Sequence, residues 1–350
     1  MAQTIPAQEV SREELAERVG ALPRERLAHL PTALEEMPRL REALGADAPR
    51  LFVKRDDATG LALGGNKVRH LEFRLGQIRA QGADTLVVNN VAQSNHARLH
   101  TALAAKYGLT NYILKIPSHK DEPVNGNLLL DHILGAQIVE ASSADPAACD
   151  RELDALVARL EAEGRKVYNV VKDSFSKVAG TCAYLVAAIE LLGQLDARGV
   201  RADHIFLAAG TSSAGLALAG KLLGAPYRVH PVSVGPDRAA VERQVCNCAN
   251  AVAERLGFAT RLTPDDIAVH DEYVGERYGV PTEAGLAALR LAGRREGLIL
   301  DPVYTGKALS ALLDQVGRGA LGRDETAVFV HTGGLPITFA YSAEVLAAMG

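Results

Sequence analysis

The sequence has no excess of positive charge. Its 38 Lys and Arg residues stand against 42 Asp and Glu residues, which gives a formal net charge of −4 at pH 7. A protein that follows a phosphate backbone usually presents a stripe of basic residues, and no such stripe is found in this sequence. We therefore expect no nucleic acid among its partners.

The sequence also lacks long apolar runs. It contains no stretch of ~18 consecutive apolar residues, which is about the length that crosses a bilayer. Residues 1–20 hold neither the basic segment nor the apolar segment of a secretory signal. These absences predict a cytoplasmic protein with no membrane partner.

Cysteine is scarce and its spacing is unsuited to zinc. Of Cys149, Cys182, Cys246 and Cys248, only the last two are close, and one intervening residue places them on different faces of a helix. No His or second Cys pair completes a zinc-binding spacing. We expect structural thiols, no metal and no disulfide, with a metal or redox site as the less favoured alternative.

Sequence repeats and low-complexity tracts are absent too, and strand-like and helical patterns alternate instead. This order predicts parallel sheets covered by helices on both faces. At 350 residues the chain is long enough for two lobes with a cleft between them. The strand-like segments are 50–57, 84–91, 111–117, 137–141, 166–171, 203–210, 227–235 and 326–332.

A glycine-rich segment opens one of the predicted helices. Gly64-Gly65-Asn66-Lys67 is followed by apolar residues at helical spacing. Lys67 would lie on the first turn, where the positive end of the helix dipole opposes an ammonium group and lowers its pKa. A neutral amine is what a Schiff base with an aldehyde requires. The alternative is an ordinary solvated lysine.

Two further segments join a strand to a helix. In Gln93-Ser94-Asn95-His96, Ser94 or Asn95 can cap the helix, whose free N–H groups suit an anion such as a substrate carboxylate. The second segment, Ala208–Gly215, is rich in Gly, Ser and Thr and suits one phosphate group. It is neither a dinucleotide-binding fingerprint nor a P-loop. A simple cap and a simple strand–helix turn are the alternatives.

Three turn-rich segments complete the set: Tyr278-Gly279-Val280-Pro281, residues 301–307 with Tyr304, and His331-Thr332-Gly333-Gly334. Each alone is typical of turn chemistry. Taken in order, the motifs GGNK, QSNH, the Gly/Ser/Thr loop, YGVP, DPVYTGKA and HTGG resemble the D-cysteine desulfhydrase and 1-aminocyclopropane-1-carboxylate deaminase family. The likeness extends from Leu30 to Tyr341.

This resemblance implies an α/β protein of the tryptophan-synthase-β-like class, which is fold type II of the pyridoxal-phosphate enzymes. The expected domains are a small one at 70–177 and a large one formed by 1–69 and 178–350. The family also implies pyridoxal 5′-phosphate as cofactor, a small amino acid as substrate and a homodimer.

The resemblance also implies roles for individual residues. Lys67 would form the Schiff base, Thr332 would face the pyridine nitrogen, and Tyr278 and Tyr304 would stand over the reacting carbon. The remaining residues are Asn66 beside the cofactor, the phosphate loop Ala209, Gly210, Thr211 and Ser212, and the substrate-binding residues Ser94, Asn95 and His96, with Ser94 also a candidate for proton transfer.

The implied reaction is β-elimination. Lys67 or a tyrosine removes the α-proton, a β-substituent leaves, and pyruvate and ammonia follow. Thr305 stands where the deaminases carry Glu, which favours the desulfhydrase reaction over ring opening. L-cysteate sulfo-lyase chemistry, the deaminase reaction and an inactive ligand-binding relative are the alternatives.

The sequence departs from the family at Lys172–Gly180, where relatives carry a glycine-rich loop. Bulk and charge replace glycine next to the expected substrate space. Lys177 could attract an anionic β-substituent such as that of cysteate.

Overall fold

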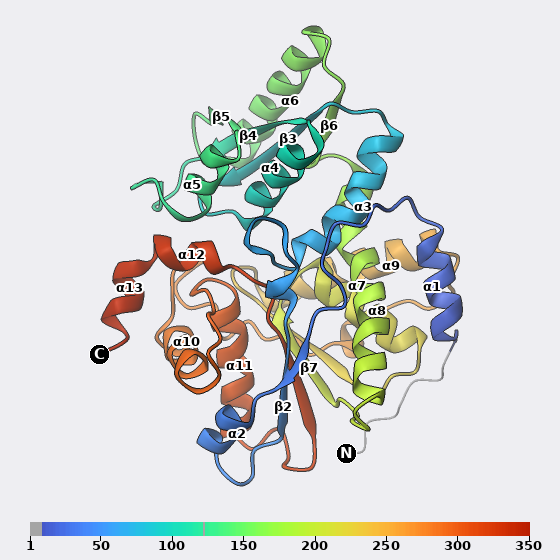
Figure 1. Cartoon of the computed structure of the whole chain (residues 1–350), viewed down its shortest axis with the longest axis vertical. Coiled ribbons are helices and arrows are strands. Elements are labelled where there is room, and N and C mark those ends of the chain that lie inside the picture. Colours follow the sequence, from blue (N-terminus) through green and yellow to red (C-terminus); the bar gives the residue numbers. More distant parts are fainter. Residues whose placement is uncertain (1–8, 122) are drawn as a thin grey trace.

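The structure is a computed structural model that describes residues 9–121 and 123–350. Residues 1–8 of the predicted large domain lie outside the described ranges. Two sheets, each accompanied by helices, form two lobes stacked along the long axis of the molecule (Figure 1). The predicted fold class is confirmed.

The first sheet has five strands in the order β1-β2-β9-β7-β8. Only its edge strand β1 is antiparallel to its neighbour, and the other pairs are parallel. Parallel strands are buried on both faces, which explains the apolar runs of the sequence. The strands are β1 Leu34–Glu36, β2 Arg50–Lys54, β7 His204–Ala208, β8 Arg228–Val232 and β9 Thr326–Val330.

The second sheet has four parallel strands in the order β5-β4-β3-β6. Its strands are β3 Thr85–Val91, β4 Thr110–Ile116, β5 Gln137–Glu140 and β6 Val167–Asn169. Every strand-like segment that the sequence predicted overlaps one of these strands. The boundaries of the two domains stay a prediction.

Helices accompany both sheets, and α3, at Lys67–Ala80, runs between the two lobes (Figure 1). The helices of the second lobe are α4 Asn95–Tyr107, α5 Gly126–Ile133 and α6 Pro146–Ala162. The others are α1 Arg12–Gly20, α2 Pro38–Leu44, α7 Ser174–Asp196, α8 Thr211–Leu222, α9 Arg238–Arg255, α10 Glu283–Glu296, α11 Thr305–Gly317, α12 Leu335–Ala340 and α13 Ser342–Ala347; short 3-10 turns occupy Asp56–Ala58, Leu61–Leu63 and Pro264–Asp266.

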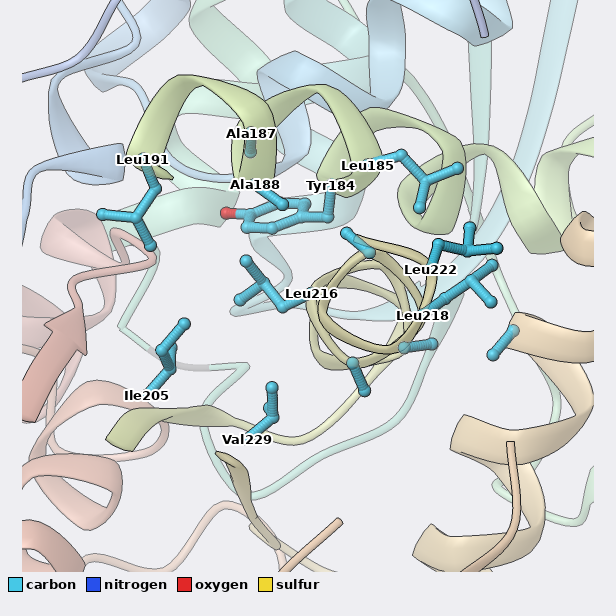
Figure 2. Close-up of a cluster of buried hydrophobic side chains, with 14 of the residues drawn as sticks. Tyr184, Leu185, Ala187, Ala188, Leu191, Ile205, Leu216, Leu218, Leu222 and Val229 are labelled. Carbon is cyan, nitrogen blue, oxygen red and sulfur yellow. The ribbon is translucent and has the colours of Figure 1, made fainter. Parts of the chain in front are cut away.

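The largest apolar core lies between α7, α8 and the first sheet. Figure 2 shows Tyr184 and Leu191 of α7 beside Leu216 of α8, above Ile205 and Val229 of the strands. Truncating one such leucine to alanine typically costs about 2–5 kcal/mol. By length and composition α7 could cross a membrane, but 67% of its most apolar window is buried inside the protein, as in a core helix.

The structure differs from expectation at two places that border the site. Residues 174–177 form the first turn of α7, because Asp173 caps this helix by accepting the Ser176 N–H at 2.7 Å. The turn-rich segment after Asp301 leads directly into α11, which starts at Thr305. Both segments are therefore helix starts, which are more rigid than loops.

Candidate active site

One cavity of about 470 Å³ lies where the two lobes meet. Residues that follow β3, β6, β7 and β9 line it, so it lies at the carboxyl ends of strands from both sheets. Ligands of open α/β sheets bind at such edges. The lining includes Asn66, Lys67, Asn89, Asn90, Ser94, Asn95, His96, Lys177, Ala209, Gly210, Thr211, Ser212, Tyr304 and Thr332.

Lys67 is held by two glycine loops that pack backbone to backbone. The Asn66 N–H donates to the Thr332 carbonyl at 2.9 Å. A Cβ atom added at Gly333 would come within 2.7 Å of the Gly65 Cα atom, so neither loop tolerates a side chain here. Gly65 has φ +114°, which favours glycine further. The motifs GGNK and HTGG therefore meet in space although they are far apart in sequence.

The Lys67 amine loses its proton more readily than an ordinary lysine does. Its pKa is lowered to about 8, mainly by burial and in addition by the positive charges of Arg74 and Arg98, while the charge of Asp301 acts in the opposite direction. Lys67 is the first residue of α3, as predicted. The predicted direction of the pKa shift is confirmed, but its largest cause is burial and not the helix dipole.

The loop Ala209–Ser212 leads into the first turn of α8, which begins at Thr211. The Ser212 hydroxyl accepts from the Asn66 side chain at 2.9 Å and lies 3.1 Å from the His70 Nε2 atom. The first N–H groups of a helix have no partner inside the helix, so this turn offers them to the cavity. The loop matches the needs of one phosphate group.

Ser94 caps α4, since its hydroxyl accepts the Ala97 N–H at 3.1 Å. The same hydroxyl donates to Asn90 at 2.9 Å. Asn95 accepts from Asn127 at 3.0 Å. His96 lines the cavity, with its ring centroid 4.2 Å from that of His100. These residues are thus fixed in place at a second helix start that faces the cavity.

Tyr304 and Tyr278 occupy different walls. Tyr304 lines the main cavity, whereas Tyr278 lines a neighbouring one of about 80 Å³ that Tyr304 also borders. Their hydroxyls are hydrogen-bonded to each other. Burial raises the pKa of both phenols, and that of Tyr304 is raised most strongly. Both phenols are therefore protonated at neutral pH. Tyr278 does not line the main cavity itself and is linked to it by its hydrogen bond to Tyr304.

Asp301 fixes the position of Tyr304. Its buried carboxylate accepts the backbone N–H groups of Val303, Tyr304 and Thr305 at 2.9, 2.7 and 3.1 Å. The Thr305 hydroxyl donates to the same carboxylate at 2.7 Å, so it faces Asp301. Thr332 lines the cavity as predicted, and Lys177 is an exposed residue at its rim.

Sequence reasoning missed several lining residues. His70 and Arg74 follow Lys67 at spacings of three and seven, so the helical period that found Lys67 places all three on one face. That spacing was a usable signal. Asp301 gave none, because an Asp before a Pro also starts an ordinary turn. Across residues 9–121 and 123–350, no group of three or more His, Cys, Asp and Glu residues could hold a metal ion.

A buried lysine with a lowered pKa beside a helix start that suits a phosphate group is typical of enzymes that use pyridoxal phosphate. The chain belongs to the family described as pyridoxal-phosphate dependent enzyme, which matches residues 25–333. Pyridoxal phosphate is therefore its cofactor.

Among curated relatives, the D-cysteine desulfhydrase of Yersinia enterocolitica serotype O:8 / biotype 1B is 37% identical over 338 residues, 95% of this chain and 99% of that protein. The D-cysteine desulfhydrase of Salmonella paratyphi C is 36% identical over 330 residues, 92% of this chain and 97% of that protein. A solved structure described as an ACC deaminase homologue is 32% identical with a TM-score of 0.86, and covers 96% of this chain and 99% of its own.

The residues present fit this cofactor. Lys67 supplies an amine with a lowered pKa, the first turn of α8 supplies free N–H groups for the phosphate, and Thr332 borders the same cavity. When bound, the cofactor supplies an aldehyde for amines and a ring that withdraws electrons from the substrate α-carbon. The chain's own residues must then orient the substrate and move its protons.

Proposed function

We propose that this protein is a β-eliminating lyase that acts on a small β-substituted amino acid, as a D-cysteine desulfhydrase does. The supporting observation is the convergence of the Lys67 amine, the Tyr304 hydroxyl and the starts of α4 and α8 on one cavity. The relatives named D-cysteine desulfhydrase indicate the substrate. The products would be pyruvate, ammonia and the released substituent.

In this proposal the residues that line the cavity bind the substrate, transfer its protons and bind the cofactor phosphate. The start of α4, capped by Ser94, holds the substrate carboxylate through free N–H groups. Lys67 carries the cofactor and, as a neutral amine, accepts the α-proton. Tyr304, a protonated phenol, donates a proton to the leaving group, and Tyr278 holds its hydroxyl in place. Asn66, His70 and Ser212 hold the phosphate end of the site.

Product formation tests this proposal. The cofactor-bound protein is supplied with D-cysteine, L-cysteine and 1-aminocyclopropane-1-carboxylate, and pyruvate, sulfide and 2-oxobutyrate are measured. We expect pyruvate and sulfide from cysteine. Formation of 2-oxobutyrate alone would overturn the proposal in favour of the deaminase reaction, which the solved ACC deaminase homologue brings into consideration.

The buried Thr305 argues for the desulfhydrase reaction. Its hydroxyl is bonded to Asp301, so the residue after Tyr304 brings no carboxylate to the cavity. The homodimer and the cytoplasmic location stay predictions, as do the roles assigned to single residues. Light scattering of the purified protein measures its oligomeric state and so tests the homodimer.

A further inference from the structure

Arg74 is a buried cation that forms no ion pair within the described residues, although the charge of Asp173 acts to raise its pKa. It lies on α3, two turns beyond Lys67, and its side chain borders the main cavity. The residue is 6% exposed. Within residues 9–121 and 123–350, no Asp or Glu oxygen comes within ion-pair distance of it. Burial lowers the pKa of Arg74 to about 10, so the guanidinium remains charged at neutral pH.

The hydrogen bonds of Arg74 leave it unsatisfied. One terminal nitrogen donates to the Ser176 carbonyl at 2.8 Å, and the other lies 3.4 Å from the His100 Nε2 atom. The His100 Nδ1 atom is 2.7 Å from the His96 carbonyl and must donate to it, so Nε2 is an acceptor. The Arg74 Nε atom has no partner. A buried charge in this state is costly unless an anion joins it.

Ser176 adds a second unsatisfied group at the same wall. It is 1% exposed, it borders the cavity, and its hydroxyl has no hydrogen-bond partner in the described chain. The nearby Tyr168 hydroxyl donates to Asp173 at 2.8 Å, and the Ser176 hydroxyl has only a weak interaction with that phenol. Among the described residues, the Arg74 Nε–H and the Ser176 hydroxyl therefore have no well-formed hydrogen bond.

Neither of the two anions already assigned explains these donors. The cofactor phosphate has the first turn of α8, and the substrate carboxylate has the first turn of α4. The hydrogen bonds of Arg74 go to the start of α7 and to His100, one turn inside α4, and none goes to Ala209–Ser212. The wall thus offers a place for a third anionic group.

We propose that Arg74 and Ser176 form a subsite for an acidic group on the substrate β-carbon, such as a sulfonate. This inference rests on the proposed function, because it names the substrate class of the same cavity. For cysteate, the α C–H and β C–S bonds break and sulfite leaves with the bonding electrons. One water then gives pyruvate and ammonium, so no oxidant or reductant is needed.

Kinetics of Arg74→Met test the subsite, with Arg79→Met as the matched control. Arg79 lies on the same helix but is exposed and bonded to Glu25. The ratio of kcat/KM for cysteate, taken as both enantiomers, to that for D-cysteine is measured. Loss of a charge-assisted hydrogen bond should lower this ratio about 10- to 100-fold in Arg74→Met. The ratio should not change in Arg79→Met. An unchanged ratio in Arg74→Met overturns the subsite.

A second variant and a binding measurement test the subsite independently of the Arg74→Met kinetics. Ser176→Ala removes an unpaired hydroxyl, so it should fold normally and still lower the ratio about 3- to 10-fold. Cysteate is also titrated against the visible absorbance of the bound cofactor, which reports binding without turnover. Tight binding by the wild type and weak binding by Arg74→Met support the subsite, even if D-cysteine gives no pyruvate and the proposed function fails.

The cofactor phosphate is the competing occupant. If Arg74→Met loses its cofactor on dialysis while the cysteate-to-cysteine ratio is unchanged, the guanidinium serves the phosphate and the subsite is overturned. If the wild type turns over D-cysteine but neither binds nor cleaves cysteate, the subsite is also overturned and the proposed function stands.

Discussion

The hydroxyls of Tyr278 and Tyr304 are hydrogen-bonded to each other, with their ring centroids 6.1 Å apart and their planes at 66°. Of the two, Tyr304 borders the main cavity, and Tyr278, a residue that is 44% exposed, lies behind it. The pair therefore combines one residue that can touch the substrate with one that positions it.

Tyr304→Phe should lower kcat by about 10²–10⁴-fold, because the proton donor is lost. Tyr278→Phe should have a smaller effect and should shift the pH profile of kcat, since the pKa of Tyr304 depends on its neighbour. Tyr273→Phe is the control, because the Tyr273 hydroxyl bonds to Asp314 outside both cavities. Equal kcat values for Tyr304→Phe and the wild type would contradict the assignment of Tyr304.

Asp301→Asn should destabilise the protein by about 1–3 kcal/mol or more, measured by urea unfolding. Both carboxylate oxygens accept hydrogen bonds, and the amide replaces one of them with a donor that faces other donors. Asp314→Asn, at a partly exposed carboxylate, should cost much less. Equal losses in the two variants would show that the turn before Tyr304 does not depend on this carboxylate.

Stability should fall on mild acidification. Burial lowers the pKa of His70, His96, His100, His230 and His331 in the folded protein. Below a pH of about 6.5 these five histidines bind more protons in the unfolded chain than in the folded protein. They outnumber Asp131 and Asp301, whose raised pKa acts in the opposite sense, so the free energy of unfolding should decrease as the pH falls. Each buried histidine contributes up to ~1.4 kcal/mol per pH unit.

Urea unfolding between about pH 7.5 and pH 5.5 measures this slope. His230→Gln should reduce it, because His230 is neutral between His204 and His270. A flat profile in the wild type would contradict the assignment of these histidines as neutral.

Lys177→Ala should change KM for an anionic substrate by no more than about threefold, because an exposed charge is screened by water and salt. Arg74→Met should have the larger effect. Steady-state kinetics with cysteate compares the two variants. If KM increases more in Lys177→Ala than in Arg74→Met, then Lys177 at the rim of the cavity, and not Arg74, determines the specificity for anionic substrates.

Much of the architecture was predictable because strands of parallel sheets are short apolar runs. The runs around Val87 and Phe206 were found in this way, and the position of Lys67 at a helix start followed from its glycines. The start of α7 was not predicted as a helix. Its N-cap, Asp173, is a local helix signal in the sequence, at a place where the family resemblance implies a glycine-rich loop.

The polar wall around Arg74 could not be predicted from sequence alone. An arginine at this spacing on a helix is usually solvated, and its burial depends on α4 and α7, which lie far along the chain. The placement of Tyr278 behind Tyr304 is likewise a tertiary relationship. The chemistry of single residues could be predicted from the sequence, whereas their contact partners are defined only by the tertiary structure.

Borohydride reduction followed by peptide mass spectrometry identifies the lysine that carries the cofactor. The cofactor-bound protein is reduced and digested, and the mass of the reduced pyridoxyl group is located. We predict a single adduct on Lys67, and none in Lys67→Ala, which should keep its fold but lose turnover. An adduct on another lysine, or one that persists in Lys67→Ala, would show that Lys67 is not the residue that carries the cofactor.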